Sequence, residues 1–181
     1  DQTGPMITLN GANPITVAHG TTYSDAGATA TDAVDGDLEV AIDTSSVNTG
    51  SVGTYEVTYT AEDNRGNTSN LTRTVIVTDQ TGPVITLNGS DSVTVAHGSE
   101  YTDEGATAND AVDRNINVTN DSSLGDTSRL GTYQVTYTAT DAASNQTNAT
   151  RTVEVTDPTG PVITLNGADP VTVAHGSVYT D

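Results

Sequence analysis

A repeat of 78 residues constrains this chain more than any other feature of its sequence. The segment DQTGPMITLNG begins at Asp1, returns as DQTGPVITLNG at Asp79, and returns again as DPTGPVITLNG at Asp157. The first two copies align without insertion or deletion, and 46 of their 78 positions are identical. Such identity over an unbroken register indicates tandem duplication of one folding unit. We therefore expect domains at residues 1–78 and 79–156, and the N-terminal strands of a third, incomplete repeat at 157–181.

The composition limits how each unit can be stabilised. A 78-residue unit is small for a self-sufficient core, and the whole chain has no Cys, Phe or Trp and a single Met. Disulfides are therefore excluded, and the chain also has no Lys, so a Lys-to-Asn isopeptide crosslink is excluded as well. We expect a light core that needs some additional means of stiffening.

The charge balance narrows the choice of partner. The formal net charge is −19, and such a surface repels phosphate backbones and anionic lipid headgroups. No apolar run approaches the length of a membrane-spanning helix. We therefore expect no nucleic-acid partner and no membrane insertion, and any export signal or anchor is expected to lie outside this segment.

Alternation of apolar and polar residues predicts strands. In GTYEVTYTAED, Tyr55, Val57, Tyr59 and Ala61 alternate with polar residues. The segment TSNLTRTVIVTD follows after a short polar turn, which predicts a β-hairpin. Its Leu71, Val75 and Val77 are expected to share the inner face. Position 76 is expected to face water despite being Ile, because the second copy has Glu154 there.

Further short strands are predicted before this hairpin. Residues 6–11 and 15–20 read as two strands separated by a break, 27–32 as another, and 38–43 as a single strand in which Leu38, Val40 and Ile42 alternate. About seven short strands per unit predict an all-β fold of tandem immunoglobulin-like antiparallel β-sandwich domains. Tyr55 sits where a tyrosine corner is expected in such a sandwich.

The order of motifs in each unit supports this prediction. The segments GPVITLNG, VTVAHG, YTDEGATA, DAVD, GTYQVTYTATD and TRTV follow one another in the second unit. Together they resemble the bacterial surface Ig-like tandem repeat family, whose Ig-like domain is also found in a pesticidal crystal protein and in large bacterial adhesins. The resemblance covers both full units and the start of the third. It implies a β-sandwich module of secreted or cell-surface proteins, without an established catalytic activity.

Acidic residues gather at the predicted junctions between units. In an Ig-type sandwich the loop at 32–37, the hairpin turn at 63–67 and the N-terminus of the domain emerge at one end. Clustered carboxylates without nitrogen or sulfur ligands favour Ca²⁺, and the arrangement is similar to cadherin-type junctions. The loop lacks EF-hand spacing. The candidate Ca²⁺ ligands are Asp32, Asp35, Asp37, Asp63, Asp79, Asp103, Asp110, Asp113 and Asp141, with Asp1 in the same class.

A structural interpretation of these residues stays open beside the calcium hypothesis. Asp and Asn in turns commonly hydrogen-bond to the nearby backbone, and Asp63 with Asn67 fits that pattern. In the second copy, the acidic segment DGD at 35–37 becomes DRN at 113–115, which places Arg114 beside the cluster. Asp25 and Asp103 lie in a loop at the opposite end, so we assign them to the junction with a neighbouring unit.

The remaining polar residues predict structure rather than catalysis. His19, His97 and His175 each occur in VAHG without Cys or a second His nearby, which favours a hydrogen-bonded turn histidine over zinc or catalysis. Arg73 and Arg151 fall on the inner register of the last strand, so we expect their stems to cover the rim of the core and their heads to pair with a carboxylate. We find no nucleophile elbow or phosphate-binding loop and expect no enzymatic activity.

These observations favour one function and leave alternatives. The first hypothesis is a non-catalytic spacer or fibre module of an extracellular bacterial surface protein, with domains stacked end to end and Ca²⁺ at the junctions. Its partners would be neighbouring repeats of the same chain or other copies in a fibre, which would make a homo-oligomer. Residues 157–181 are expected to pack on a continuation of the chain or on a neighbouring copy. The alternatives are a ligand- or carbohydrate-binding adhesive module, or accessory repeats of a secreted enzyme or toxin.

Overall fold

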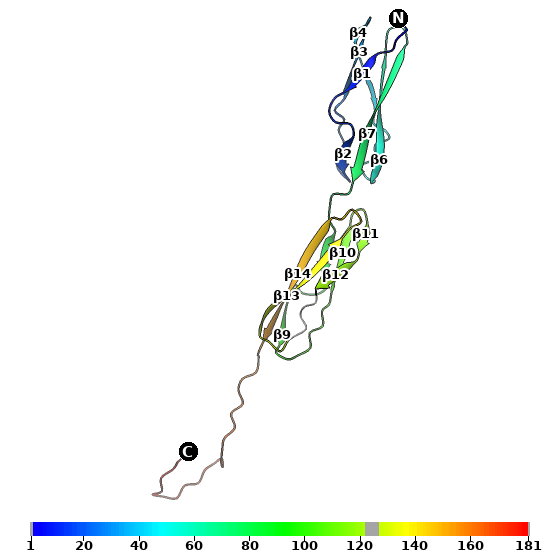
Figure 1. Cartoon of the computed structure of the whole chain (residues 1–181). Helices are drawn as coiled ribbons and strands as arrows, with labels where there is room; N and C mark the ends of the chain where they lie inside the picture. Colours follow the sequence, from blue (N-terminus) through cyan, green and yellow to red (C-terminus); the bar gives the residue numbers. More distant parts are fainter. Residues whose placement is uncertain (1, 122–126, 181) are drawn as a thin grey trace.

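The chain forms two β-sandwiches arranged end to end. The computed structural model describes residues 2–121 and 127–180. We call residues 1–78 repeat 1 and residues 79–156 repeat 2. Figure 1 shows repeat 1 at one end of an elongated molecule, repeat 2 beneath it, and an extended C-terminal segment at the other end. No helix among the described residues is long and apolar enough to cross a membrane.

In the part of the chain that the structure describes, each repeat contains seven strands. Those of repeat 1 are β1 (Met6–Leu9), β2 (Ile15–Ala18), β3 (Ala28–Asp32), β4 (Gly36–Leu38), β5 (Ala41–Asp43), β6 (Gly53–Glu62) and β7 (Thr68–Thr78). Those of repeat 2 are β8 (Val84–Leu87), β9 (Ser92–Ala96), β10 (Ala106–Asp110), β11 (Arg114–Ile116), β12 (Val118–Asp121), β13 (Gly131–Thr140) and β14 (Gln146–Thr156). The predicted all-β tandem sandwich is confirmed.

Two sheets form each sandwich. In repeat 1 the smaller sheet has the order β1-β3-β4 and the larger has the order β2-β7-β6-β5. Repeat 2 reproduces them as β8-β10-β11 and β9-β14-β13-β12. The predicted hairpin is β6–β7, in which Gly53 pairs with Val77 and Glu62 pairs with Thr68. One strand pair per repeat is parallel, β2 with β7 and β9 with β14. The predicted antiparallel pairing therefore does not hold for these two pairs.

The parallel pairs arise because the first part of each repeat changes sheets. β1 pairs with β3 in the smaller sheet, and after the break at residues 10–14 the chain continues in the same direction as β2 beside β7. The sequence showed the break but not the change of sheet. A similar change corrects the prediction of one strand at 38–43, because β4 pairs with β3 whereas β5 pairs with β6 in the other sheet. Ile42 is accordingly 43% exposed.

The core of each repeat is small and rests on Val and Tyr. Val57, Tyr59 and Val75 are fully buried in repeat 1, and Val135, Tyr137 and Val153 occupy the same positions in repeat 2. Leu71 was predicted on the inner face but is 37% exposed, so the buried inner face of β7 begins after this residue. Ile76 lies partly exposed on the other face of β7.

The predicted tyrosine corner is present in both repeats. The Tyr55 hydroxyl donates to the carbonyl oxygen of Ser51 at 2.9 Å, and the Tyr133 hydroxyl donates to that of Arg129 at 3.0 Å. These bonds fasten the chain where it enters β6 and β13.

Residues 157–180 do not form the strands expected for a third repeat. They are exposed and without strand assignment, including the large apolar side chains of Val162, Ile163 and Val178, which are 91%, 86% and 90% exposed. In repeats 1 and 2 the corresponding strands are stabilised by pairing with the third and seventh strands of the same unit. Within the 181 residues the third copy ends before those segments.

Two turn positions distinguish the repeats. Gly36 and Gly66 of repeat 1 have φ values of 75° and 85°, whereas the matching residues of repeat 2, Arg114 and Ser144, have φ values of 65° and 72°. A side chain at positive φ costs about 1 kcal/mol relative to glycine. We therefore expect Arg114→Gly to raise the free energy of unfolding of repeat 2 by about 0.5–1 kcal/mol, measured by urea denaturation. Arg129→Gly is the control for loss of one positive charge, and equal stability of R114G and wild type would contradict the prediction.

Candidate metal centre at the repeat junction

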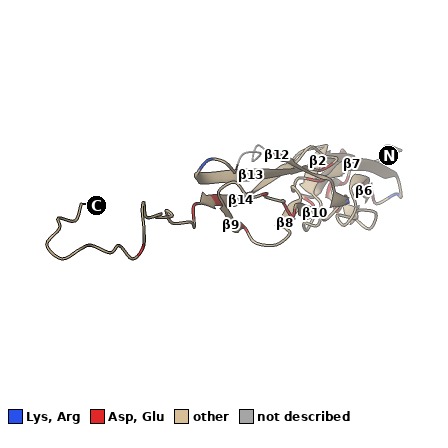
Figure 2. Ribbon diagram, turned by 90° about the horizontal axis from the view of Figure 1, so that it is seen from below, with Lys and Arg blue, Asp and Glu red and all other residues tan. Residues whose placement is uncertain are grey.

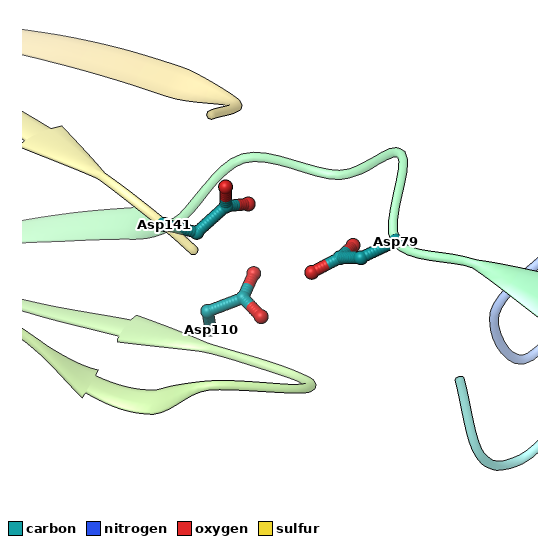
Figure 3. A group of neighbouring side chains, drawn as sticks. All are labelled: Asp79, Asp110 and Asp141. Carbon is teal, nitrogen blue, oxygen red and sulfur yellow. The ribbon is translucent and has the colours of Figure 1, made fainter. Parts of the chain in front are cut away.

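Three carboxylates converge where repeat 1 meets repeat 2. Asp79 directly follows β7, Asp110 is the last residue of β10, and Asp141 directly follows β13. One oxygen atom from each lies within 4.8 Å of the others, and Figure 3 shows the three side chains pointing toward a common centre. The group therefore joins the linker to the body of repeat 2, because Asp79 is the first residue after the last strand of repeat 1 while the other two lie at the ends of β10 and β13.

The linker directs Asp79 into this group. Its Oδ1 atom accepts hydrogen bonds from the backbone N–H and the hydroxyl of Thr81, at 3.1 and 3.0 Å. Its Oδ2 atom is buried and finds no hydrogen-bond partner among the described residues. A buried carboxylate oxygen without a partner is costly. The Oδ2 atom therefore marks a position where an electropositive ligand would be stabilised.

Asp110 and Asp141 are held by hydrogen bonds from their own loops. They are 4% and 7% exposed. Asp110 Oδ1 accepts from the backbone N–H groups of Val112 and Asp113 at 2.7 and 3.1 Å, and Asp141 accepts from the backbone and side-chain nitrogens of Asn145 at 2.7 and 2.8 Å. The hydrogen bond from Val112 is the largest cause that lowers the pKa of Asp110, and it outweighs the effect of burial. Asp110 is therefore ionised at neutral pH.

The negative charge of the group is not balanced by an ion pair among the described residues. The ion pairs found among the described residues are Arg73–Asp25 and Arg151–Asp103, and neither includes a member of the group. Like charges at this separation repel strongly when they are partly removed from water. Carboxylate oxygens are hard ligands, which favour Ca²⁺ at about 2.3–2.6 Å over softer metals. The arrangement is therefore chemically suited to Ca²⁺ bound by Asp79, Asp110 and Asp141.

Asp113 lies beside this group and forms a hydrogen bond between two loops of repeat 2. Its Oδ2 atom accepts from the backbone N–H of Ala142 at 2.8 Å, which ties the loop after β10 to the turn after β13. Asp35 does the same in repeat 1, where it accepts from the side chain and backbone of Asn64 at 2.7 and 3.3 Å. Both residues therefore brace the two acidic loops against one another.

Repeat 1 has the same pair of carboxylates at the end from which its N-terminus emerges. Asp32 accepts hydrogen bonds from Val34 and Asp35, and Asp63 accepts them from Arg65 and Asn67. Asp63 lies close enough for its charge to oppose the lowering of the pKa of Asp32 that these hydrogen bonds cause. The third predicted member, Asp1, lies outside the described residues.

Residues that form hydrogen-bonded turns are therefore also members of the carboxylate group, so the two interpretations of the sequence do not exclude each other. Asp63 and Asn67 form the predicted Asx-type turn, with the two side chains bonded at 2.6 Å. Asp141 and Asn145 repeat it, and the Asn145 side chain also donates to the carbonyl oxygen of Thr81 in the linker at 3.2 Å. Asp37, another predicted ligand, is an exposed residue of β4 and is not part of the group.

Asp103 is not at a junction, and neither is Asp25. Each forms an ion pair within its own repeat, Asp103 with Arg151 and Asp25 with Arg73, and both arginines are 1% exposed. The assignment of Asp103 to a metal cluster is therefore wrong. The prediction that the arginines pair with a carboxylate is confirmed, but their heads lie inside the sandwich rather than at its rim.

These ion pairs connect both sheets of each sandwich. Asp25 accepts from Arg73 at 2.6 Å, from Tyr59 at 2.7 Å and from Tyr23 at 2.5 Å. Arg73 also donates to the carbonyl oxygen of Asn10, at the point where the chain leaves β1 for β2. Burial would raise the pKa of Asp25, but the hydrogen bonds from both tyrosines and the charge of Arg73 outweigh it and lower the pKa. Burial and Asp25 raise the pKa of Tyr59.

Apolar contacts accompany the acidic group at the junction. Val112 of repeat 2 is partly buried, whereas the matching Val34, at the N-terminal end of repeat 1, is 64% exposed. A cavity of about 450 Å³ remains between the repeats. Its lining consists of Val52, Thr78, Asp79, Val112, Asp113, Ala142 and Ala143.

Gly82 permits close packing of the linker. A Cβ atom at this position would lie 2.7 Å from the Thr147 hydroxyl, whereas at Gly160, the matching position in the next linker, it would meet nothing within 4 Å. We expect Gly82→Ala to displace the linker and lower the melting temperature of repeat 2 by several degrees. Differential scanning calorimetry measures the change. Gly160→Ala is the matched control, and equal effects of the two variants would contradict this account.

Both repeats resemble known proteins in sequence. The model of the family described as "Bacterial surface protein, Ig-like domain" matches residues 7–77 and 85–155. An uncharacterized 81.3 kDa protein of Acholeplasma phage L2 is 38% identical over 126 residues, covering 65% of this chain and 17% of the phage protein. The pesticidal crystal protein Cry22Aa of Bacillus thuringiensis is 34% identical over 151 residues, covering 77% of this chain and 20% of the crystal protein. The chain thus spans no more than about a fifth of these relatives.

Solved structures with a similar arrangement of strands are distant in sequence. One holds the M60 catalytic domain with the CBM51-1 and CBM51-2 domains of Clostridium perfringens ZmpB, with a TM-score of 0.46, 15% identity, and coverage of 84% of this chain and 31% of that one. Another holds fibronectin(III)-like modules of Clostridium thermocellum CbhA, with a TM-score of 0.33, 16% identity, and coverage of 90% and 100%. The two matches of the family model take in most of both sandwiches, and the chain belongs to the family of bacterial surface proteins with Ig-like domains.

Proposed function

We propose that this chain is a non-catalytic spacer of an extracellular bacterial surface protein, in which Ig-like repeats stack end to end and Ca²⁺ stiffens each junction. The observation that carries the proposal is the convergence of Asp79, in the linker directly after β7, with Asp110 and Asp141 of two loops of repeat 2. A cation bound there would tie the end of β7 to two loops of repeat 2. It would thereby restrict bending at the short linker between the sandwiches.

The surface of the two sandwiches supports a spacer over a carbohydrate-binding module. Sugar-binding sites commonly present aromatic side chains. Tyr59 and Tyr137 are buried, and Tyr55 and Tyr133 are half-buried with their hydroxyl groups bonded to the backbone. Figure 2 shows acidic residues along both sandwiches and only isolated basic ones. Such an excess of negative charge favours solubility and causes electrostatic repulsion between the side surfaces of separate molecules.

Calcium binding to the intact chain tests the proposal. Chelator-treated protein is titrated with CaCl₂ by isothermal titration calorimetry. We expect saturable binding that is at least about tenfold weaker in Asp79→Asn, because this variant removes the charge of the carboxylate whose Oδ2 atom has no partner. Asp91→Asn, an exposed position outside the group, makes the same change in net charge and is the matched control. Equal binding by the two variants, or no binding by the wild type, would remove calcium from the proposal.

A further inference from the structure

We propose that the parallel strand pairs β2–β7 and β9–β14 act as shear clamps, which resist tension applied along the chain. This inference rests on the proposed spacer function, because a spacer in a surface protein is pulled through its two ends. It extends that function to a mechanical one and assigns it to specific strands. The hydrogen bonds of the clamp are made without the side chains of Asp79, Asp110 and Asp141, so the clamp does not require a bound cation.

The topology places these strands on the path of force. In repeat 2 the chain passes through β8 and then β9 and leaves through β14. Figure 1 shows that it enters this repeat at one end and leaves it at the other. β9 and β14 are adjacent in the larger sheet. They are therefore the place where the entering and the leaving parts of the repeat are directly bonded to each other.

The direction of pairing determines how the force acts. Ser92 to Ala96 pair in parallel with Thr152 to Thr156, so a pull on both ends draws β9 and β14 past one another along their length. The hydrogen bonds cross between the strands, so this sliding loads all of them together. An antiparallel hairpin pulled at its open end would instead lose its bonds one after another. The same geometry occurs in repeat 1, where Ile15 to Ala18 pair with Val75 to Thr78.

The histidine of the VAHG motif fastens the end of each clamp. His97 donates its backbone N–H to the carbonyl oxygen of Thr156, the last residue of β14, at 2.8 Å. Its ring Nε2 atom lies 2.7 Å from the carbonyl oxygen of Ser128, in the loop before β13. His19 makes the matching contacts with Thr78 at 2.8 Å and with Gly50 at 3.0 Å. The motif thus joins the end of the first clamp strand to the adjacent strand and to the loop that precedes β13 or β6.

The buried arginine fastens the other end. Arg151 lies on β14 one residue before the paired segment and donates to the carbonyl oxygens of Asn88 and Ser90, which lie between β8 and β9. The backbone N–H of Thr152 also donates to the carbonyl oxygen of Asp91 at 2.9 Å. Sliding of β9 along β14 therefore has to break contacts at both ends of the pair.

Single-molecule force spectroscopy on the full chain, held at its two ends, tests the clamp. The matched variants are Val95→Ala in β9 and Val135→Ala in β13, which remove the same group from one core. We expect both to lower the melting temperature of repeat 2. At a constant force, we expect V95A to raise the unfolding rate of repeat 2 about tenfold and V135A to change it less than about twofold. Repeat 1 unfolds in the same molecule and serves as an internal reference.

The outcomes distinguish this inference from the spacer and from calcium. Equal acceleration by V95A and V135A would overturn the clamp, because resistance would then follow overall stability. His97→Ala, which removes the ring contact at the end of β9, is expected to accelerate unfolding under force, with His175→Ala in the exposed C-terminal segment as its control. The measurements are made with and without chelator. Loss of calcium binding leaves the contrast between V95A and V135A intact, so failure of the cation and failure of the clamp are separate results.

Discussion

Arg73→Met is expected to lower the free energy of unfolding of repeat 1 by about 3–5 kcal/mol. The guanidinium group is 1% exposed and the Asp25 side chain is 7% exposed, so removing one partner leaves a buried carboxylate without its counter-charge. The substitution also removes the bond to Asn10, which connects the two sheets, and the contact of the guanidinium with the Tyr59 ring at 5.4 Å. Urea denaturation followed by circular dichroism is expected to separate into two steps, with repeat 1 unfolding first.

Arg65→Met is the matched control for Arg73→Met. Arg65 is exposed in the turn between β6 and β7, so this variant changes the net charge by the same amount without disturbing the core. We expect it to change stability by less than about 0.5 kcal/mol. A single denaturation step in R73M at the wild-type midpoint would show that the buried pair does not hold the sheets together.

Saturating Ca²⁺ is expected to stabilise the chain by several kcal/mol. A ligand that binds only the folded state contributes about 4 kcal/mol when its concentration is a thousand times its dissociation constant. Repeat 2 supplies Asp110 and Asp141, so its unfolding transition is the one that shifts upward. Differential scanning calorimetry with CaCl₂ and with chelator measures the shift.

The junction variants decide whether that shift comes from the proposed site. Asp79→Asn is expected to lose most of the calcium-dependent shift, while Asp91→Asn keeps it. Arg114→Gly offers a second control, because it removes a positive charge from the residue that pairs with Asp110 across β10 and β11. We expect a larger calcium shift in R114G than in the wild type. A shift that is the same in all three variants would place the bound calcium elsewhere.

Much of the fold was predictable because the repeat supplied its own comparison. Comparison of the two copies showed that Ile76 faces outward, because the second copy has Glu154 at the same position. Alternation of apolar and polar residues in β6 identified Tyr59 as a core residue. The split of 38–43 into two strands was not predictable in this way. Leu38, Val40 and Ile42 alternate as they would in one strand, and only the pairing with different neighbours separates β4 from β5.

The candidate site was predictable in its composition and less so in its assembly. Loops that emerge at one end of a sandwich bring Asp110 and Asp141 together, and the repeat boundary adds Asp79. The prediction placed Asp103 at a junction because the sequence does not show which distant residue its side chain contacts in the folded repeat. Arg151 lies on the inner face of β14, and an inward arginine needs a carboxylate that reaches it from another loop. The position of Arg151 on an apolar register predicted that it pairs with a carboxylate, but it did not identify Asp103 as that carboxylate.

The distance between the two repeats tests the central claim most directly. The chain has no cysteine, so Glu56→Cys and Gln134→Cys place one spin label on β6 and one on β13, at matching exposed positions of repeats 1 and 2. Double electron–electron resonance with CaCl₂ is expected to give one narrow distance distribution, which broadens when calcium is chelated or when Asp79→Asn is added. A broad distribution that calcium leaves unchanged would contradict the account, because the sandwiches would then move independently about the linker.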